Sequence, residues 1–124
     1  MTGGRKAAEA RGRRAETWAA LYLRLKGYRI LDRRARLKVG ELDLVAEKAD
    51  RLVFVEVKQR KTRATALESV TIKQRMRIER AALLWRAKHK KDKQSLRFDV
   101  IAIAWPYWPT HIKDAWQANV QAKL

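Results

Sequence analysis

Two neighbouring segments, Glu41-Leu-Asp-Leu-Val-Ala-Glu47 and Leu52-Val-Phe-Val-Glu-Val-Lys-Gln59, carry the strongest indication of how this chain folds. Both segments are typical of β-strands, and the second is apolar on both faces until Glu56, which predicts a central strand covered on both sides. The connection Lys48-Ala-Asp-Arg51 has the length of a hairpin turn. We therefore expect the two segments to pair as neighbouring strands of one sheet.

The residues on either side of this hairpin predict helices and further strands. Gly27 is a suitable end for a first helix, and Thr71 with Gln74 can cap a second one. In chain order, the expected elements are a helix over 5–26, a strand over 28–32, a basic loop over 33–39, the two strands above, a helix over 69–88, a strand over 96–104 and a short helix over 111–121. The order α-β-β-β-α-β-α predicts an α/β fold with a single mixed β-sheet flanked by helices, in one domain over residues 1–124.

Composition excludes several classes of protein. The 124 residues are 47% hydrophobic, which is enough for a core, so we do not expect the chain as a whole to be disordered. The absence of Cys rules out disulfides, Cys-ligated zinc, iron–sulfur clusters and thiol nucleophiles. His89 and His111 are isolated in the sequence, and we expect both at the surface rather than in a metal site or a triad. No apolar run is long enough for a signal peptide or a membrane span, so we expect a soluble protein of the prokaryotic cytoplasm, a reducing compartment, with no membrane partner.

The charge of the chain favours a polyanionic partner. Lys and Arg number 30 against 13 Asp and Glu, which gives a net charge of +17 at pH 7. Residues 37–58, however, contain five acidic and four basic side chains, so a small acidic island separates two strongly basic blocks. A protein that only coats nucleic acid would gain from positive charge along its whole length. The acidic island therefore indicates a role beyond charge attraction.

Asp43, Glu56 and Lys58 lie within this acidic island. Residues i and i+2 of a strand project to the same face, and Asp43 lies on the adjacent strand, so the three side chains can converge. Two carboxylates with a backbone carbonyl suit Mg²⁺ or Mn²⁺, and Lys58 would then lie beside the activated water or the phosphate. Glu16, next to the apolar stripe of the first helix, is a candidate third carboxylate. The alternative is a solvated Glu56–Lys58 pair, although charges in a covered strand without a partner would cost free energy.

Beyond these residues, the chain resembles the YraN-like family of predicted endonucleases, whose members are similar to archaeal Holliday-junction resolvases and to restriction endonucleases. The matching segments follow one another over most of the chain: Ala15-Glu16, Ala19, Tyr22-Leu23, Lys26–Leu31, Gly40–Leu44, Val53–Arg60, Lys73 and Arg97–Val100. Their order and spacing are far more specific than a Glu-x-Lys motif alone. One departure is Ala15, where the family usually has Gly.

The resemblance implies a restriction-endonuclease-like fold and a nuclease site of the Asp…Glu-x-Lys type. In such a site Asp43 and Glu56 would bind Mg²⁺ or Mn²⁺, and Lys58 would be the catalytic lysine. Glu16 would match the carboxylate on the first helix of the resolvases. Glu41 belongs to the same motif and would either support a metal ligand or be solvated.

Basic side chains on either side of this site are candidate phosphate contacts. They are Arg60, Lys61 and Arg63 in the segment after the second strand of the hairpin, and Lys73, Arg77 and Arg80 in the second helix. A solvated helix face is the ordinary interpretation, but the near absence of acidic partners favours contact with phosphates. Lys73 also matches the family and is expected to face the site.

Two further groups of residues have more than one interpretation. Trp105, Tyr107 and Trp108 either stack on unpaired bases or, as we favour, cover the core or form a subunit contact. Asp99 lies on the same strand face as Arg97, which predicts a buried salt bridge between them.

These observations favour a metal-dependent endonuclease that hydrolyses phosphodiester bonds in DNA, and the resemblance adds a preference for branched or otherwise structured DNA. The sequence leaves monomer and homodimer open, although the resemblance makes a homodimer possible, because resolvase-like enzymes cut symmetric junctions as dimers. The alternatives are a non-catalytic nucleic-acid-binding module on a degenerate nuclease fold, and a basic protein associated with RNA or the ribosome. Only the enzyme needs Asp43, Glu56 and Lys58 together, and the sequence contains all three.

Overall fold

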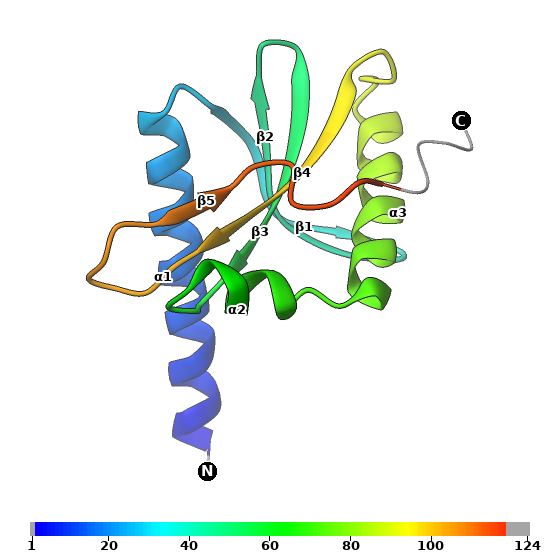
Figure 1. The fold of residues 1–124 in the computed structure, drawn as a ribbon. Coiled ribbons are helices and arrows are strands. Elements are labelled where there is room, and N and C mark those ends of the chain that lie inside the picture. Colours follow the sequence, from blue (N-terminus) through cyan, green and yellow to red (C-terminus); the bar gives the residue numbers. More distant parts are fainter. Residues whose placement is uncertain (1, 119–124) are drawn as a thin grey trace.

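A mixed β-sheet lies between two long helices in the computed structural model, which describes residues 2–118 (Figure 1). The elements are α1 (Thr2–Leu25), β1 (Arg29–Leu37), β2 (Gly40–Lys48), β3 (Arg51–Lys58), α2 (Arg63–Glu68), α3 (Ile72–Lys88), β4 (Ser95–Ala102) and β5 (Thr110–Ile112). The five strands follow the order β1-β2-β3-β4-β5 across the sheet, and the β3–β4 pair is parallel while the other pairs are antiparallel. The α/β class with one mixed sheet flanked by helices is therefore confirmed.

The central strand β3 contributes to two separate cores, one on each face of the sheet. Leu52 and Phe54 pack on the face covered by α3, where Trp85 is the largest buried side chain of the helix. Val53 and Val55 pack on the opposite face against the buried stripe of α1, which consists of Ala15, Ala19, Ala20 and Leu23. The prediction of a central strand covered on both sides is confirmed. Because both faces of β3 are buried, the strand provides a rigid support for the residues at its carboxyl end.

Gly27 ends the first helix, as the sequence predicts. Its φ of 92° lies in the left-handed region that favours glycine, and its N–H donates to the carbonyl of Arg24 at 3.0 Å. The next N–H, of Tyr28, donates to the carbonyl of Leu23 at 3.0 Å. These two bonds form a Schellman motif, which satisfies the last carbonyls of α1 and directs the chain into β1.

The helix α3 begins at Ile72 with half of the predicted capping box. The hydroxyl of Thr71 accepts a hydrogen bond from the backbone N–H of Gln74 at 3.1 Å. The side chain of Gln74 does not return to Thr71; its amide donates to Oε1 of Glu56 at 3.4 Å instead. The capping position therefore orients a side chain toward the end of β3.

The expected loop over 33–39 is wrong for residues 33–37, because β1 continues through Leu37, which pairs with Gly40 of β2; only Lys38 and Val39 form a turn. Its many Arg side chains suggested a loop, but in an edge strand charged side chains can point to solvent while the backbone pairs. Ala35 is buried between exposed Arg34 and Arg36, which is the alternation of a half-buried strand.

The expected helix over 111–121 is also wrong within the described residues, and its last residues, 119–121, lie outside them. Thr110–Ile112 pair with β4 as a short strand, and Trp116 is buried against the α3 core after a turn. The spacing of Ile112 and Trp116 suits one helical turn, but a strand followed by a turn buries both equally well. The six-residue helix α2, capped by Thr62, is too short to show periodicity and was not expected.

In the part of the chain that the structure describes, no helix combines the length and apolar character that crossing a membrane requires.

Candidate functional site

Asp43 and Glu56 meet where β2 and β3 stop pairing. The ladder between these strands runs from Lys48 and Arg51 to Leu44 and Val55, and the two carboxylates belong to the next residue of each strand. The backbone N–H of Val57 donates to Oδ2 of Asp43 at 2.9 Å. The carboxyl groups of Asp43 and Glu56 are themselves close enough to hydrogen-bond to each other. We call these two side chains the carboxylate pair.

Burial makes the carboxylate pair costly to ionise. Only 5% of Glu56 is exposed, and this burial, together with the charge of Asp43, raises the pKa of Glu56 well above its ordinary value. Burial also raises the pKa of Asp43, with a further contribution from the charge of Glu16, although the N–H of Val57 acts in the opposite direction. Two adjacent acids with raised pKa values form a site that a cation would stabilise.

Lys58 offsets only part of this negative charge. It lies two residues after Glu56 on β3, is half-buried, and its charge lowers the pKa of both carboxyl groups. Within residues 2–118, however, no Lys, Arg or His nitrogen forms an ion pair within 4.0 Å of either carboxylate. The structure therefore brings Asp43, Glu56 and Lys58 together without neutralising the two acids.

Glu16 approaches this site from α1 but is engaged by another residue. Its charge contributes to the raised pKa of Asp43, which places it near the carboxylate pair. Its Oε1 accepts a hydrogen bond from Nε of Arg34 at 2.7 Å. Among the described residues, no group of three or more His, Cys, Asp or Glu side chains is arranged to hold a metal ion. In this arrangement two carboxylates, rather than three, are available to a metal.

Within the described residues, two other predicted residues form no hydrogen bond or ion pair with the carboxylate pair. Glu41 is exposed and pairs with Arg36 across the β1–β2 ladder, where Nε of Arg36 lies 3.0 Å from Oε1 of Glu41. Lys73 is exposed in the first turn of α3. Its neighbour Gln74, which the sequence interpretation considered only as a cap, is the residue of α3 that contacts Glu56. The position of Gln74 in the first turn of α3 is the one sequence feature that indicates this contact, but the direction of its side chain depends on how α3 packs.

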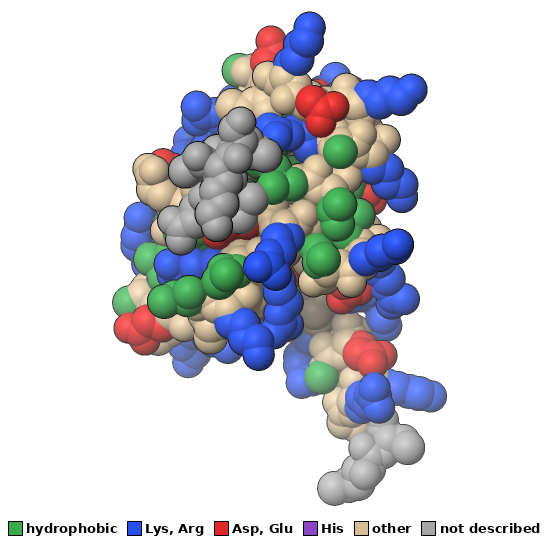
Figure 2. Space-filling model, turned by 90° about the vertical axis from the view of Figure 1, so that its right-hand side faces the viewer, with side chains coloured by type: hydrophobic (Ala, Val, Ile, Leu, Met, Phe, Trp, Pro, Cys, Tyr) green, Lys and Arg blue, Asp and Glu red, His purple; other side chains and the backbone are tan. Residues whose placement is uncertain are grey.

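All six predicted phosphate contacts are exposed. Lys73, Arg77 and Arg80 lie along one face of α3, opposite its buried stripe, and Arg60, Lys61 and Arg63 lie in the segment after β3. Within residues 2–118, none of the six forms an ion pair with a carboxylate. Lys and Arg side chains are spread over the face of the molecule on which α3 lies (Figure 2). Such unpaired cations are available to a polyanion.

A second polar cluster, centred on Asp99, lies inside the fold. Arg97 donates two hydrogen bonds to the Asp99 carboxylate, at 2.9 and 2.7 Å, so the predicted buried salt bridge is confirmed. Nε2 of His111 lies 2.7 Å from the same carboxylate, and the His111 side chain is 2% exposed, so the surface prediction for this residue is wrong. It failed because β5 was expected as a helix. His89 is exposed, as predicted, and stacks on Trp85.

The aromatic residues after β4 do not cover the core. Trp105, Tyr107 and Trp108 are 75%, 70% and 66% exposed, respectively. The interpretation as a cover of the core is therefore wrong, which leaves stacking on bases and a subunit contact.

Comparison with known proteins identifies the family. The profile of the Uncharacterised protein family UPF0102 matches residues 15–103. A UPF0102 protein of Maricaulis maris is 50% identical over 124 residues, which cover 99% of this chain and 98% of that protein. UPF0102 proteins of Agrobacterium fabrum and Parvibaculum lavamentivorans are 46% and 48% identical, over 90% and 86% of this chain and 92% and 80% of their own lengths. The chain therefore belongs to the family UPF0102, the YraN-like family that its sequence motifs indicate.

Proposed function

We propose that this protein is a metal-dependent endonuclease that hydrolyses phosphodiester bonds in DNA at the carboxylate pair. One observation carries the proposal: half-buried Asp43 and buried Glu56 lie together, both with raised pKa values, in a protein whose net charge is +17. Two adjacent acids removed from water reduce stability unless a cation or a proton compensates them. Such a pair in a strongly basic protein suits metal-dependent hydrolysis of a phosphodiester.

The oxygen atoms at this position suit Mg²⁺ or Mn²⁺. Mg²⁺ is commonly bound through one or two carboxylates and keeps its remaining positions for water and substrate phosphate. Asp43 and Glu56 supply two carboxylates, and the chain has no Cys while His111 is engaged by Asp99, so oxygen is the donor type at the pair. When bound, such an ion lowers the pKa of a coordinated water and polarises a phosphate oxygen.

The surrounding residues have distinct roles in this proposal. The N–H of Val57 fixes the carboxylate of Asp43, and the amide of Gln74 fixes that of Glu56, so both acids are positioned before the substrate arrives. The ammonium group of Lys58, beside the pair, stabilises the negative charge that develops on the phosphate or orients the attacking water.

The exposed cations position the DNA. Arg60, Lys61 and Arg63 follow Lys58 directly and would bind the phosphates that flank the cleaved bond. Lys73, Arg77 and Arg80 extend this contact along α3. Phosphate contacts fix the register of the backbone but carry no base sequence, so we propose cleavage directed by DNA structure. The resemblance to junction resolvases favours branched DNA.

The test is a cleavage assay on labelled duplex, nicked, flapped, four-way and single-stranded DNA, with Mg²⁺, Mn²⁺, Ca²⁺ or EDTA. We expect Mg²⁺ or Mn²⁺ to support cleavage of at least one branched form, and Asp43→Asn, Glu56→Gln and Lys58→Ala to abolish it while DNA binding persists. Asp92→Asn, the same change at an exposed position between α3 and β4, is the matched control and should cleave as the wild type does. Binding without cleavage of any form in Mn²⁺ would instead identify a non-catalytic nucleic-acid-binding module.

A further inference from the structure

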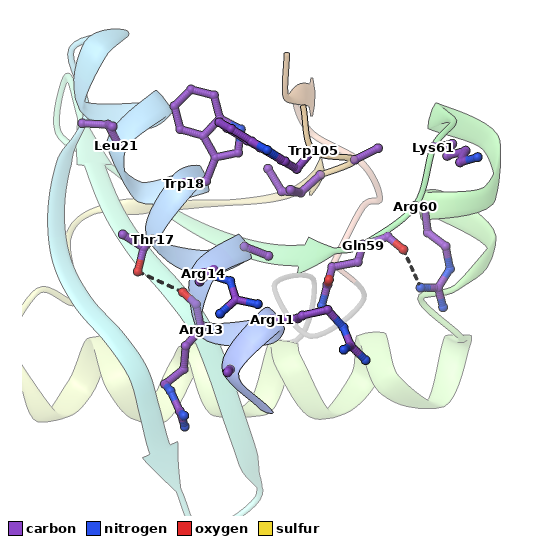
Figure 3. Close-up of a pocket in the computed structure, with 14 residues that line it drawn as sticks. Arg11, Arg13, Arg14, Thr17, Trp18, Leu21, Gln59, Arg60, Lys61 and Trp105 are labelled. Atoms are coloured by element: carbon purple, nitrogen blue, oxygen red, sulfur yellow. Dashed lines mark hydrogen bonds between the residues drawn. The ribbon is translucent and has the colours of Figure 1, made fainter. Parts of the chain in front are cut away.

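A groove of about 1000 Å³ opens between α1 and the segments that follow β3 and β4 (Figure 3). We call it the α1 groove; its lining includes Arg11, Arg14, Trp18, Arg60, Lys61 and Trp105. Its lining also includes Ala15 and Thr17, which flank Glu16, and Gln59, which follows Lys58. The groove is thus lined by chain neighbours of Glu16 and Lys58, while Asp43, Glu56 and Lys58 are not among its described lining residues.

An exposed indole lies at one side of the α1 groove. Trp105 is 75% exposed, yet its ring makes an edge-to-face contact with Trp18, with ring centroids 5.8 Å apart. Trp108 contacts the same Trp18 at 5.5 Å. These contacts hold Trp105 in place while most of its surface remains open. A large, fixed and exposed aromatic ring is the usual platform for a nucleobase.

Cationic side chains also line the groove, among apolar residues such as Leu21 and Ile103. Arg11, Arg14, Arg60 and Lys61 are all exposed, and no Asp or Glu is among the groove's described lining residues. Within residues 2–118, none of these four cations forms an ion pair with a carboxylate. Figure 3 shows Trp18 and Trp105 together on one side of the groove, with Arg11, Arg14 and Arg60 around the opposite side. Phosphates and bases could therefore be bound along the same groove.

The indole nitrogen of half-buried Trp18 adds an independent observation. Its Nε1 has no hydrogen-bond partner among the described residues. A buried donor without a partner costs free energy, and most buried donors in proteins are paired. A small movement of Trp18 on binding would let this N–H donate to a base carbonyl.

We propose that the α1 groove binds an unpaired DNA strand, with a base stacked on Trp105 and phosphates bound by Arg11, Arg14, Arg60 and Lys61. The inference rests on the proposed function and specifies its substrate: DNA in which a single-stranded segment emerges next to the cleaved bond. Stacking on an indole requires a base that is not already stacked in a duplex. A second copy of the chain is a poorer occupant, because a symmetric contact would place these cations against their own counterparts.

The first experiment measures binding of a fluorescein-labelled oligothymidylate by anisotropy in EDTA, so that no cleavage is needed. Because stacking contributes about 1–3 kcal/mol per base, Trp105→Ala should weaken binding by about 5-fold or more. Tyr107→Ala is the matched control, because Tyr107 is 70% exposed in the same loop but does not line the groove. It should bind as the wild type does, and Trp105→Phe, which keeps a ring, should retain most of the affinity. Blunt duplex DNA should bind equally to all four proteins.

The second experiment tests the phosphate contacts. The double variant Arg60→Ala/Lys61→Ala should lower the salt dependence of oligothymidylate binding, by a slope of about 0.7 per lost contact. Lys88→Ala/Lys93→Ala removes the same charge from exposed positions at the far end of α3 and beyond it, and should leave the slope nearly unchanged.

Different outcomes contradict the groove proposal and the endonuclease proposal. A Trp105→Ala protein that retains its fold by circular dichroism and binds oligothymidylate as tightly as the wild type overturns the groove proposal. Sedimentation that shows a wild-type dimer, dissociated by Trp105→Ala with DNA binding intact, overturns it in favour of a subunit contact. If the wild type cleaves no DNA but Trp105→Ala loses single-strand binding, the enzyme proposal fails and the groove proposal stands.

Discussion

The backbone N–H of Val57 donates a hydrogen bond of 2.9 Å to the carboxylate of Asp43, across the position where β2 and β3 stop pairing. A ladder bond between the two strands is thus replaced by a bond to a side chain. This bond positions Asp43 beside Glu56 through the backbone of β3, and no cationic side chain is needed for it.

Asp43→Asn should separate metal binding from folding. Without metal, the variant should melt no lower than the wild type, because burial and the neighbouring acids disfavour the ionised Asp43 and the Asn side chain can still accept from Val57. A divalent ion that binds only the folded wild type stabilises it by about 2.7 kcal/mol at a hundred times its dissociation constant. We expect Mn²⁺ to raise the Tm of the wild type and of Asp92→Asn, and to leave that of Asp43→Asn nearly constant, in differential scanning fluorimetry. A wild type whose Tm ignores both Mn²⁺ and Mg²⁺ would argue against the metal site.

Asp99→Asn should destabilise the protein in a pH-dependent way. Burial alone would raise the pKa of Asp99, but the hydrogen bonds from His111, Arg97 and the N–H of Asp114 outweigh it and hold that pKa below its ordinary value. A lowered pKa in the folded state stabilises the fold above the unfolded-state pKa, about 3.9, and this stabilisation is lost as the pH falls toward the folded-state value. Breaking a buried pair costs on the order of 3–5 kcal/mol, so urea denaturation should show a loss of this size near pH 7. The difference between variant and wild type should shrink below about pH 4. A difference that does not change with pH would contradict the electrostatic role of Asp99.

DNA binding should weaken strongly as the salt concentration rises, and duplex and branched DNA should depend on the same phosphate contacts. With several phosphate contacts, raising salt from about 50 to 200 mM should weaken binding by orders of magnitude, because counterions are released from the DNA. Arg77→Ala/Arg80→Ala should weaken duplex and branched DNA about equally, since phosphate contacts carry no sequence information. Fluorescence anisotropy across a salt series measures both effects, with Lys93→Ala as the control. Loss of binding to one DNA structure alone would mean that these two Arg residues recognise shape.

Replacing Gly27, which follows α1, and Gly12, which lies within it, by Ala should change the free energy of unfolding in opposite directions. Gly27 has a φ of 92°, where an Ala side chain is strained, so Gly27→Ala should destabilise the protein by about 1–2 kcal/mol. Gly12 lies within α1 and an added Cβ would meet nothing within 4 Å, so Gly12→Ala should stabilise the protein by roughly 0.5–1 kcal/mol. Guanidinium denaturation of the two variants gives both values. A Gly27→Ala variant as stable as the wild type would show that Gly27 is not required for the end of α1.

The parts of the site that depend on local geometry could be predicted from the sequence. Strand alternation places Glu56 and Lys58 on one face, and the hairpin length places Asp43 on the neighbouring strand; the structure has this arrangement. The contact between Gln74 and Glu56 could not be predicted, because it depends on how α3 packs on the sheet. The Arg34–Glu16 pair was missed for a related reason: Arg34 lay in a segment expected as a loop, so its position relative to α1 was undefined.

The same limit applies to the two edges of the fold. The long, apolar strands β3 and β4 could be identified from their residues, because burial on both faces requires continuous apolar segments. β1 and β5 carry weaker patterns, since an edge strand is partly exposed and its pairing is decided by its neighbour rather than by its own residues. His111 was misplaced with β5, and the Asp99 cluster was therefore only half predicted.

The Arg residues of β1 have a consequence for how copies of this protein meet one another at high concentration. The outer edge of β1 offers unpaired backbone groups, which could template the addition of a strand from another molecule. Arg29, Arg33, Arg34 and Arg36 are all exposed along this strand, and Arg34 has a φ of 51°, which departs from extended geometry. The opposite edge, β5, has only three residues. Charge repulsion on one side and a short strand on the other therefore protect the sheet against edge-to-edge aggregation.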